Sequence, residues 1–193
     1  MLSVQQIMGV NAILGNTAVK DMQGTTRAIY DIVQAEGNRA TFFETVASRQ
    51  YPFTNISQNR FEVGETLAIE SIALLWLEEG LQDNGNIVNH PFEAIAGSNK
   101  SLNLDLYIGN QRVLKSLDLS YMVNGLGNTN PGQIARDAQG FQAPAVFRLE
   151  TPLVIVPQVE FYATLQFPVS VGTNTFALIL QGTGTLLNTQ NNF

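Results

Sequence analysis

The strongest constraint on the fold is the run of residues 149–167, together with the shorter apolar run 175–181 that follows it. From Phe161 to Phe167, apolar and polar residues alternate, which is the period of a strand with one buried face. Pro157 has no N–H to donate, so it predicts a corner between two strands. We expect three consecutive strands here, forming one antiparallel sheet that needs a second sheet to cover it.

Further strands are indicated along the rest of the chain by β-branched and alternating residues. We predict them at 40–46, 61–77 (one strand or two, with a bulge at Gly64), 102–108, 112–122 and 145–156, with a hairpin turn at Gly109-Asn110. The total is about eight strands with no βαβ alternation. The predicted fold class is therefore all-β, an antiparallel two-sheet jelly-roll sandwich.

One short helix is predicted ahead of these strands, at about 25–36. Thr25 or Thr26 can cap it, an apolar stripe runs from Ala28 to Val33, and Gly37 can adopt the left-handed conformation that ends a helix.

Residues 1–24 mix apolar residues with glycines and amides and hold neither the helical nor the strand period. This segment either folds onto its own domain or docks as an arm on a neighbouring subunit. We divide the chain into an N-terminal arm, 1–24, and a single jelly-roll domain, 25–193.

The composition favours contact with other proteins over contact with nucleic acid. Only 13% of the 193 residues are charged, against a usual share of about 25%, and Asn and Gln make up about a sixth of the chain. A net charge of −6 gives weak repulsion between copies. The ten Lys and Arg residues are scattered, so the basic patch of a nucleic-acid binder is missing.

Several classes of protein are disfavoured by what the sequence lacks. Without Cys there is no disulfide, thiolate metal site or thiol catalysis. The first residues have no basic region followed by a long apolar region, so we expect no signal peptide. The longest apolar run, 72–77, is far too short to span a membrane. We therefore expect a soluble protein.

Few residues are suited to chemistry. The single His90 cannot form a histidine-cluster metal site, and no nucleophile elbow accompanies it. Glu78, Glu79 and Asp83 could serve glycoside hydrolysis, but adjacent acids at a strand end more often form a solvated edge. The loop 83–86 could donate oxygens to Ca²⁺, although the EF-hand spacing is absent and a plain turn is favoured.

Two other kinds of motif are weak. The pairs Gly125/Gly127 and Gly182/Gly184 do not lie between a strand and a helix, so neither predicts a phosphate-binding loop. Aromatic residues could form a platform for stacking a sugar, but most fall in apolar runs and are expected in the core. These residues are Trp76, Tyr107, Tyr121 and Tyr162. We therefore predict no catalytic, metal or cofactor-binding residue.

The segment 51–65 leads into an apolar strand, and the segment 154–161 is followed by a strand pair that ends at Gly184. Together they resemble the small jelly-roll structural proteins of bacteriophage particles: capsid, penton, or auxiliary and head-fibre subunits. The resemblance implies self-assembly, an N-terminal arm that reaches a neighbour, and loops that contact other virion proteins. That family has no catalytic residues to transfer.

The leading hypothesis is thus a virion structural subunit that assembles with itself and with other virion proteins and binds no cofactor. The candidate assembly contacts are Leu2, Val4, Ile7, Met8, Ile13 and Leu14. One alternative is a carbohydrate-binding or receptor-binding jelly-roll module that uses the loops 78–98 and 124–144. A third possibility is a glycosidase or lyase that uses Glu78, Glu79 or Asp83.

Overall fold

The computed structural model describes residues 22–49, 51–77, 102–119 and 145–187. Within these ranges the chain forms eight β-strands and a short 3-10 turn. They are β1 (Met22–Gln34), β2 (Arg39–Phe42), the turn η2 (Val46–Ser48), β3 (Thr66–Leu77), β4 (Asn103–Ile108), β5 (Gln111–Asp118), β6 (Ala145–Ile155), β7 (Phe161–Gln166) and β8 (Thr175–Leu187). Among these residues, no helix has the length and apolar character needed to cross a membrane.

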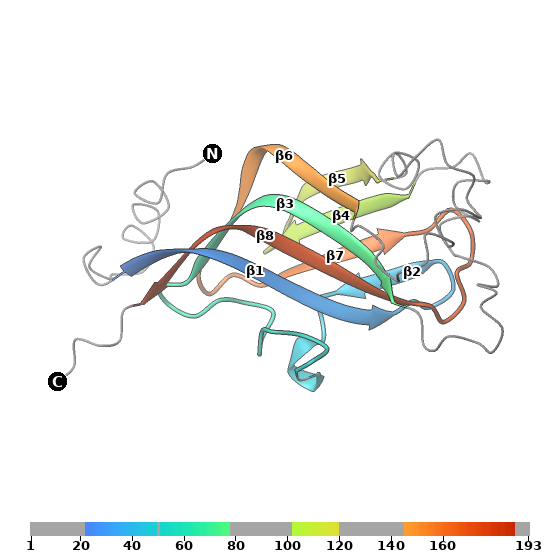
Figure 1. Ribbon diagram of the computed structural model, residues 1–193, viewed down its shortest axis with the longest axis horizontal. Coiled ribbons are helices and arrows are strands. Elements are labelled where there is room, and N and C mark those ends of the chain that lie inside the picture. Colours follow the sequence, from blue (N-terminus) through green and yellow to red (C-terminus); the bar gives the residue numbers. More distant parts are fainter. Residues whose placement is uncertain (1–21, 50, 78–101, 120–144, 188–193) are drawn as a thin grey trace, which may run out of the picture.

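The strands pair as one long hairpin that has been rolled up. β1 pairs with β8, β2 with β7, β3 with β6 and β4 with β5, all antiparallel. Two further pairs, β3 with β8 and β4 with β7, join them into the sheets β1-β8-β3-β6 and β2-β7-β4-β5. Figure 1 shows the first sheet in front of the second. This is an eight-stranded antiparallel jelly roll, so the predicted fold class is confirmed.

The prediction that the three C-terminal strands form one sheet is wrong. β6 and β8 belong to the same sheet but are separated by β3, and β7 belongs to the other sheet. The chain changes sheet at Pro157, which forms an isolated bridge with Phe61, and Gln158 follows with a φ of 61°. Pro157 therefore does mark a corner, but the corner leads to the opposite sheet.

The core lies between the two sheets and is rich in phenylalanine. The inward residues Phe161, Ala163 and Leu165 of β7 are fully buried, as the alternation predicts. The ring of Phe161 lies 5.5 Å from that of Phe43 and 5.3 Å from that of Phe61, centroid to centroid. Because Phe43 and Phe61 lie outside the strands, these contacts tie the connecting segments to the sandwich.

The predicted helix at 25–36 is also wrong, because most of this segment is strand β1. All of β1 is in register with β8, from Met22 opposite Leu187 to Gln34 opposite Thr175. Ile29 and Val33 fit either a helical stripe or a strand that buries alternate residues, and the pairing with β8 decides in favour of the strand. Gly37, with a φ of 66°, forms the turn into β2 rather than the end of a helix.

Two glycine predictions have different outcomes. Gly109, with a φ of 58°, lies in the predicted turn between β4 and β5. Gly64 was expected to form a bulge inside a long strand, but it lies in the turn before β3, with a φ of 85°. The bulge of β3 is found at Glu70, between the paired residues Ile69 and Ser71.

Candidate functional site

Most of the residues considered for chemistry lie outside the described residues. These are His90, Glu78, Glu79, Asp83 with the loop 83–86, Tyr121, and Gly125 with Gly127. The same holds for the six candidate assembly contacts in the arm, for the rest of residues 1–21, and for the whole of the loops 78–98 and 124–144. The predictions about them stay predictions. Within the described ranges, no group of three or more His, Cys, Asp or Glu residues is placed to hold a metal ion.

The glycines of the motif 182–184 lie in strand β8, where they allow a close approach of strands. A Cβ atom at Gly182 would lie 1.8 Å from the carbonyl oxygen of Ala68, and one at Gly184 would lie 2.9 Å from the carbonyl oxygen of Thr66. Both oxygens belong to β3, which bulges beside Gly182. These glycines therefore have a structural role in the sheet.

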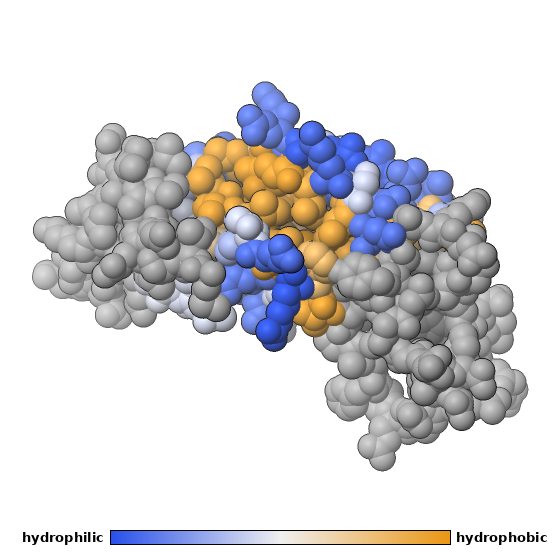
Figure 2. Space-filling view, turned by 90° about the horizontal axis from the view of Figure 1, so that it is seen from above, coloured by the Kyte–Doolittle hydropathy of each residue, from blue (hydrophilic) through white to orange (hydrophobic). Residues whose placement is uncertain are grey.

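One long side of the sandwich presents apolar surface between its two edge strands, β5 and β6. Figure 2 shows a continuous apolar area there, bordered by polar residues. Half-buried side chains from both strands pack against the core at this side: Val113, Leu114, Leu117, Phe147, Leu149 and Leu153. We call this surface the open side.

The two long sides differ in how their strand edges are covered. At β1, the edge is bonded to the segment 53–55: Ile32 N–H donates to Phe53 O (2.8 Å), and Tyr30 N–H donates to the side chain of Asn55 (2.9 Å). Within the described residues, β6 pairs only with β3, and β5 pairs only with β4. In this part of the chain, the open side thus combines apolar side chains with the edge strands of both sheets.

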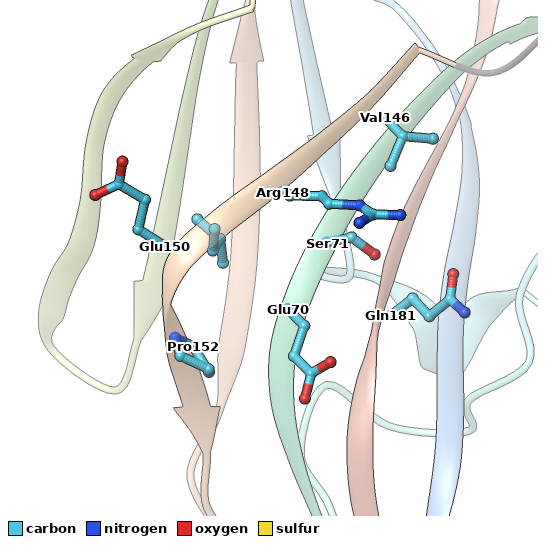
Figure 3. A pocket seen from close by; sticks show the side chains of 8 residues that line it. Glu70, Ser71, Val146, Arg148, Glu150, Pro152 and Gln181 are labelled. Atoms are coloured by element: carbon cyan, nitrogen blue, oxygen red, sulfur yellow. The ribbon is translucent and has the colours of Figure 1, made fainter. Parts of the chain in front are cut away.

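A hollow of about 420 Å³ lies on the outer face of the sheet β1-β8-β3-β6. It arises because β6 leaves its register with β3: Arg148 is opposite Ser71 and Leu153 is opposite Ile69, so residues 149–152 face the single residue Glu70. In Figure 3, Arg148 and Ser71 lie next to each other in the hollow, and Glu70 and Gln181 lie below them on either side. Its lining also includes Val146, Leu149, Glu150 and Pro152.

The charged groups of this hollow do not form a catalytic pair. Glu70 accepts a hydrogen bond from the hydroxyl of Thr183 (2.9 Å), which holds its carboxylate at β8. The side chain of Glu150 points away from Glu70 in Figure 3. Arg148 makes no ion pair or hydrogen bond with the described residues. The hollow is best understood as the result of the bulge in β6.

The outer face of the other sheet carries a pair of tyrosines that the sequence placed in the core. Tyr107 of β4 lies opposite Tyr162 of β7, and their rings stack with centroids 4.5 Å apart and planes 6° apart. Both are half-buried, whereas the neighbouring residues Leu106 and Phe161 are fully buried. The expectation of a core position was wrong because strand alternation turns both tyrosines outward.

An ion pair fixes the strand next to these tyrosines. The carboxylate of Asp105 accepts hydrogen bonds from the side chain of Arg112 and from the N–H of Ser116 (2.6 Å). Ser116 has a φ of 47°, at an irregularity in the pairing of β5 with β4. Asp105 therefore holds the bulged part of β5 against the sheet.

A second ion pair is buried beneath the segment that follows β2. Asp31 of β1 is fully buried, and its Oδ2 accepts hydrogen bonds from Phe43 N–H (2.6 Å) and Arg49 Nη2 (2.7 Å). Burial raises the pKa of the Asp31 carboxyl above its usual value, although the Phe43 hydrogen bond and the Arg49 charge act in the opposite direction. Asp31 thus links β1 to the chain on both sides of η2, at Phe43 before it and at Arg49 after it.

Comparison with known proteins finds no match at the level of sequence. No protein-family model matches the chain, and no curated protein matches it. One solved structure that the comparison matches is the major capsid protein P2 from Bacteriophage PM2, with a TM-score of 0.38 and 7% sequence identity. The similar region covers 92% of this chain and 49% of that chain, so this chain spans about half the length of the capsid protein.

Proposed function

We propose that this protein is a virion structural subunit, a jelly-roll capsid or capsid-associated protein that assembles with copies of itself and has no catalytic activity. The observation that carries the proposal is the open side, where half-buried apolar side chains meet two strand edges. Apolar surface of this kind on a folded domain is typical of a protein–protein interface. The low charge of the chain supports the same proposal, because copies repel one another only weakly.

The assignment to a virus particle rests on the sequence resemblance of the segments 51–65 and 154–184, together with the jelly-roll architecture. A jelly roll by itself does not define a function, since lectin domains and enzymes also use it. The location in the particle is tested by peptide mass spectrometry of purified phage particles from the source of the gene. If the protein is absent from such particles, its proposed place in the virion is wrong.

Self-assembly is tested by light scattering over a concentration series, with negative-stain imaging of any large species. We expect a discrete oligomer or a shell, because closed symmetry multiplies a modest apolar contact. A monomer of 21.1 kDa at every concentration would contradict self-assembly of the isolated protein.

Substituting Val113 by Asp tests the open side directly. Val113 of β5 is only partly buried, so the domain should still fold, which circular dichroism checks, but a carboxylate buried in an interface without a partner is costly. We expect the concentration needed for assembly to rise by about tenfold or more, the equivalent of about 1.4 kcal/mol. The matched control is Val63→Asp, at a valine that is 41% exposed in the turn before β3 and should leave assembly unchanged. Equal effects of the two variants would mean that the open side is not the interface.

A further inference from the structure

We propose that the outer face of the sheet β2-β7-β4-β5 binds neutral carbohydrate, with Tyr107 and Tyr162 as the stacking residues. This inference goes beyond the structural role and does not depend on self-assembly. It also assigns the sugar site to a sheet face and not to the loops 78–98 and 124–144, which the sequence suggested for one.

Tyr162 lies near a margin of the sheet, whereas Tyr107 has Tyr162 of β7 on one side and Arg112 of β5 on the other. β2 ends at Phe42, which pairs with Ala163, so β2 has no residue opposite Tyr162. The next residue, Phe43, has a φ of 65° and is buried in the core. One face of the Tyr162 ring stacks on Tyr107. On the other side of β7, the strand β2 has ended and the segment at Asn59 lies beside the strand, where Asn59 O accepts a hydrogen bond from Phe161 N–H (2.8 Å). The face of an aromatic ring is electron-rich and attracts the polarised C–H groups on the apolar side of a sugar ring.

Polar groups suited to sugar hydroxyls lie beside this pair. Thr41 of β2 is opposite Thr164 of β7, and in the next row Gln166 of β7 is opposite Asn103 of β4. Among the described residues, the side chains of these four make no hydrogen bond. Hydroxyl and amide groups both donate and accept, as do the hydroxyls of a sugar, so they can serve either role. A few polar groups beside an aromatic surface are the usual composition of a small-ligand site.

The charges of this face favour a neutral ligand. Arg112 and Asp105 are bonded to each other, so neither presents an unpaired charge. Arg39 and Asp118 lie at opposite margins of the row that contains Gln166 and Asn103, and their charges are opposite. These four formal charges sum to zero, and the one other charged residue of the sheet's strands, Lys115, is exposed at the irregular part of β5. The net charge is therefore small and gives an anionic or cationic ligand little general attraction.

Binding is tested with the intact protein and a panel of neutral oligosaccharides of glucose, galactose, mannose and N-acetylglucosamine, by isothermal titration calorimetry. We expect at least one to bind, and Tyr107→Ala and Tyr162→Ala each to weaken that binding by about tenfold or more, the equivalent of about 1.4 kcal/mol. Tyr107→Phe and Tyr162→Phe keep the rings and should retain most of the binding. The matched control is Tyr51→Ala, at a tyrosine that is 82% exposed in the segment after η2.

A second measurement uses the native protein, so it does not depend on the folding of a variant. Hydroxyl-radical footprinting with mass spectrometry should show that the bound oligosaccharide protects Tyr107 and Tyr162 from oxidation but leaves Tyr51 unprotected. The proposal is overturned if no neutral oligosaccharide binds, if sialylated or sulfated sugars bind in preference, or if binding leaves both tyrosines unprotected. In each case the tyrosine pair serves only to stabilise the contact between β4 and β7.

Discussion

At the scale of single residues, Asp31 is the clearest case of a side chain whose position the sequence does not reveal. In the sequence it interrupts an apolar stripe, whereas in the structure it is fully buried and holds Phe43 and Arg49. Its pKa is raised, so the folded protein favours the protonated carboxyl more than the unfolded chain does. The contribution of Asp31 to stability is therefore fully present below the unfolded pKa and is lost as the pH rises through the folded pKa.

The direction in which the stability contribution of Asp31 changes with pH gives a prediction for the variant Asp31→Asn. The free energy of unfolding of the native protein should fall relative to that of the variant as the pH rises from below 3.8, the ordinary pKa of an aspartate, through the raised pKa of Asp31. The slope can be at most about 1.4 kcal/mol per pH unit, and the difference should be constant at higher pH. Urea unfolding from pH 3 to pH 7 measures this difference in the free energy of unfolding.

The variant Arg49→Met should extend to higher pH the range over which the difference changes, since the charge that lowers the pKa of Asp31 is removed. A difference that grows in favour of the native protein with rising pH would contradict this account.

The tyrosine pair shows where residue type alone misleads. Tyr107 and Tyr162 lie in apolar runs, and this suggested the core. The alternation of inward and outward residues along these strands does predict an outward position for both tyrosines, because Leu104, Leu106, Phe161 and Ala163 take the inward positions. What the sequence could not supply is the register between β4 and β7, which places the two rings side by side.

At the scale of elements, the strands with strong alternation were predictable and β1 was not. The runs 102–108 and 161–167 were predicted almost to the residue as β4 and β7. In β1, the apolar residues have a spacing that fits a helix as well as a strand. Its pairing partner, β8, is at the other end of the chain, so local sequence carries no signal of the contact that decides the outcome.

The covered edge of β1 gives a prediction at this scale. Asn55 accepts a hydrogen bond from Tyr30 N–H and donates one to Ala28 O (2.8 Å), so one side chain serves two main-chain groups of the strand. Asn55→Ala should lower the free energy of unfolding by about 1–3 kcal/mol, the loss of two hydrogen bonds. It should also increase aggregation, because the edge of β1 becomes accessible to other strands. Urea unfolding and light scattering measure the two effects.

The matched control for Asn55 is Asn59→Ala. Asn59 contacts the sandwich through its main-chain oxygen, which accepts a hydrogen bond from Phe161 N–H (2.8 Å) and is kept in the variant. We expect Asn59→Ala to have little effect on either measurement. Equal losses for both variants would mean that the side chain of Asn55 does not protect the edge.

At the scale of the whole molecule, the jelly roll could be predicted from the number of strands and the absence of βαβ alternation. The assignment of strands to sheets could not. Pro157 was correctly placed at a corner, but a corner can return the chain to the same sheet or take it to the other one. The burial of Phe43 and Phe61 against Phe161, which links the connecting segments to β7, appears only once the sandwich is formed.

The proposed assembly gives the last prediction, which concerns the N-terminal arm. β1 begins at Met22, so the deletion that spares the sheet removes residues 1–21. We expect the shortened protein to fold with the same strand content, since the pairing of β1 with β8 is kept from Met22 onward, but to lose its large assemblies. Circular dichroism and light scattering measure the two outcomes.

A full-length variant keeps the length of the arm but replaces its six apolar contact residues by Ser. These residues are Leu2, Val4, Ile7, Met8, Ile13 and Leu14. This variant should fail to assemble in the same way, because apolar contact is what the arm would supply. Assembly that survives in both variants would remove the arm from the proposal and leave the open side between β5 and β6 as its one remaining interface.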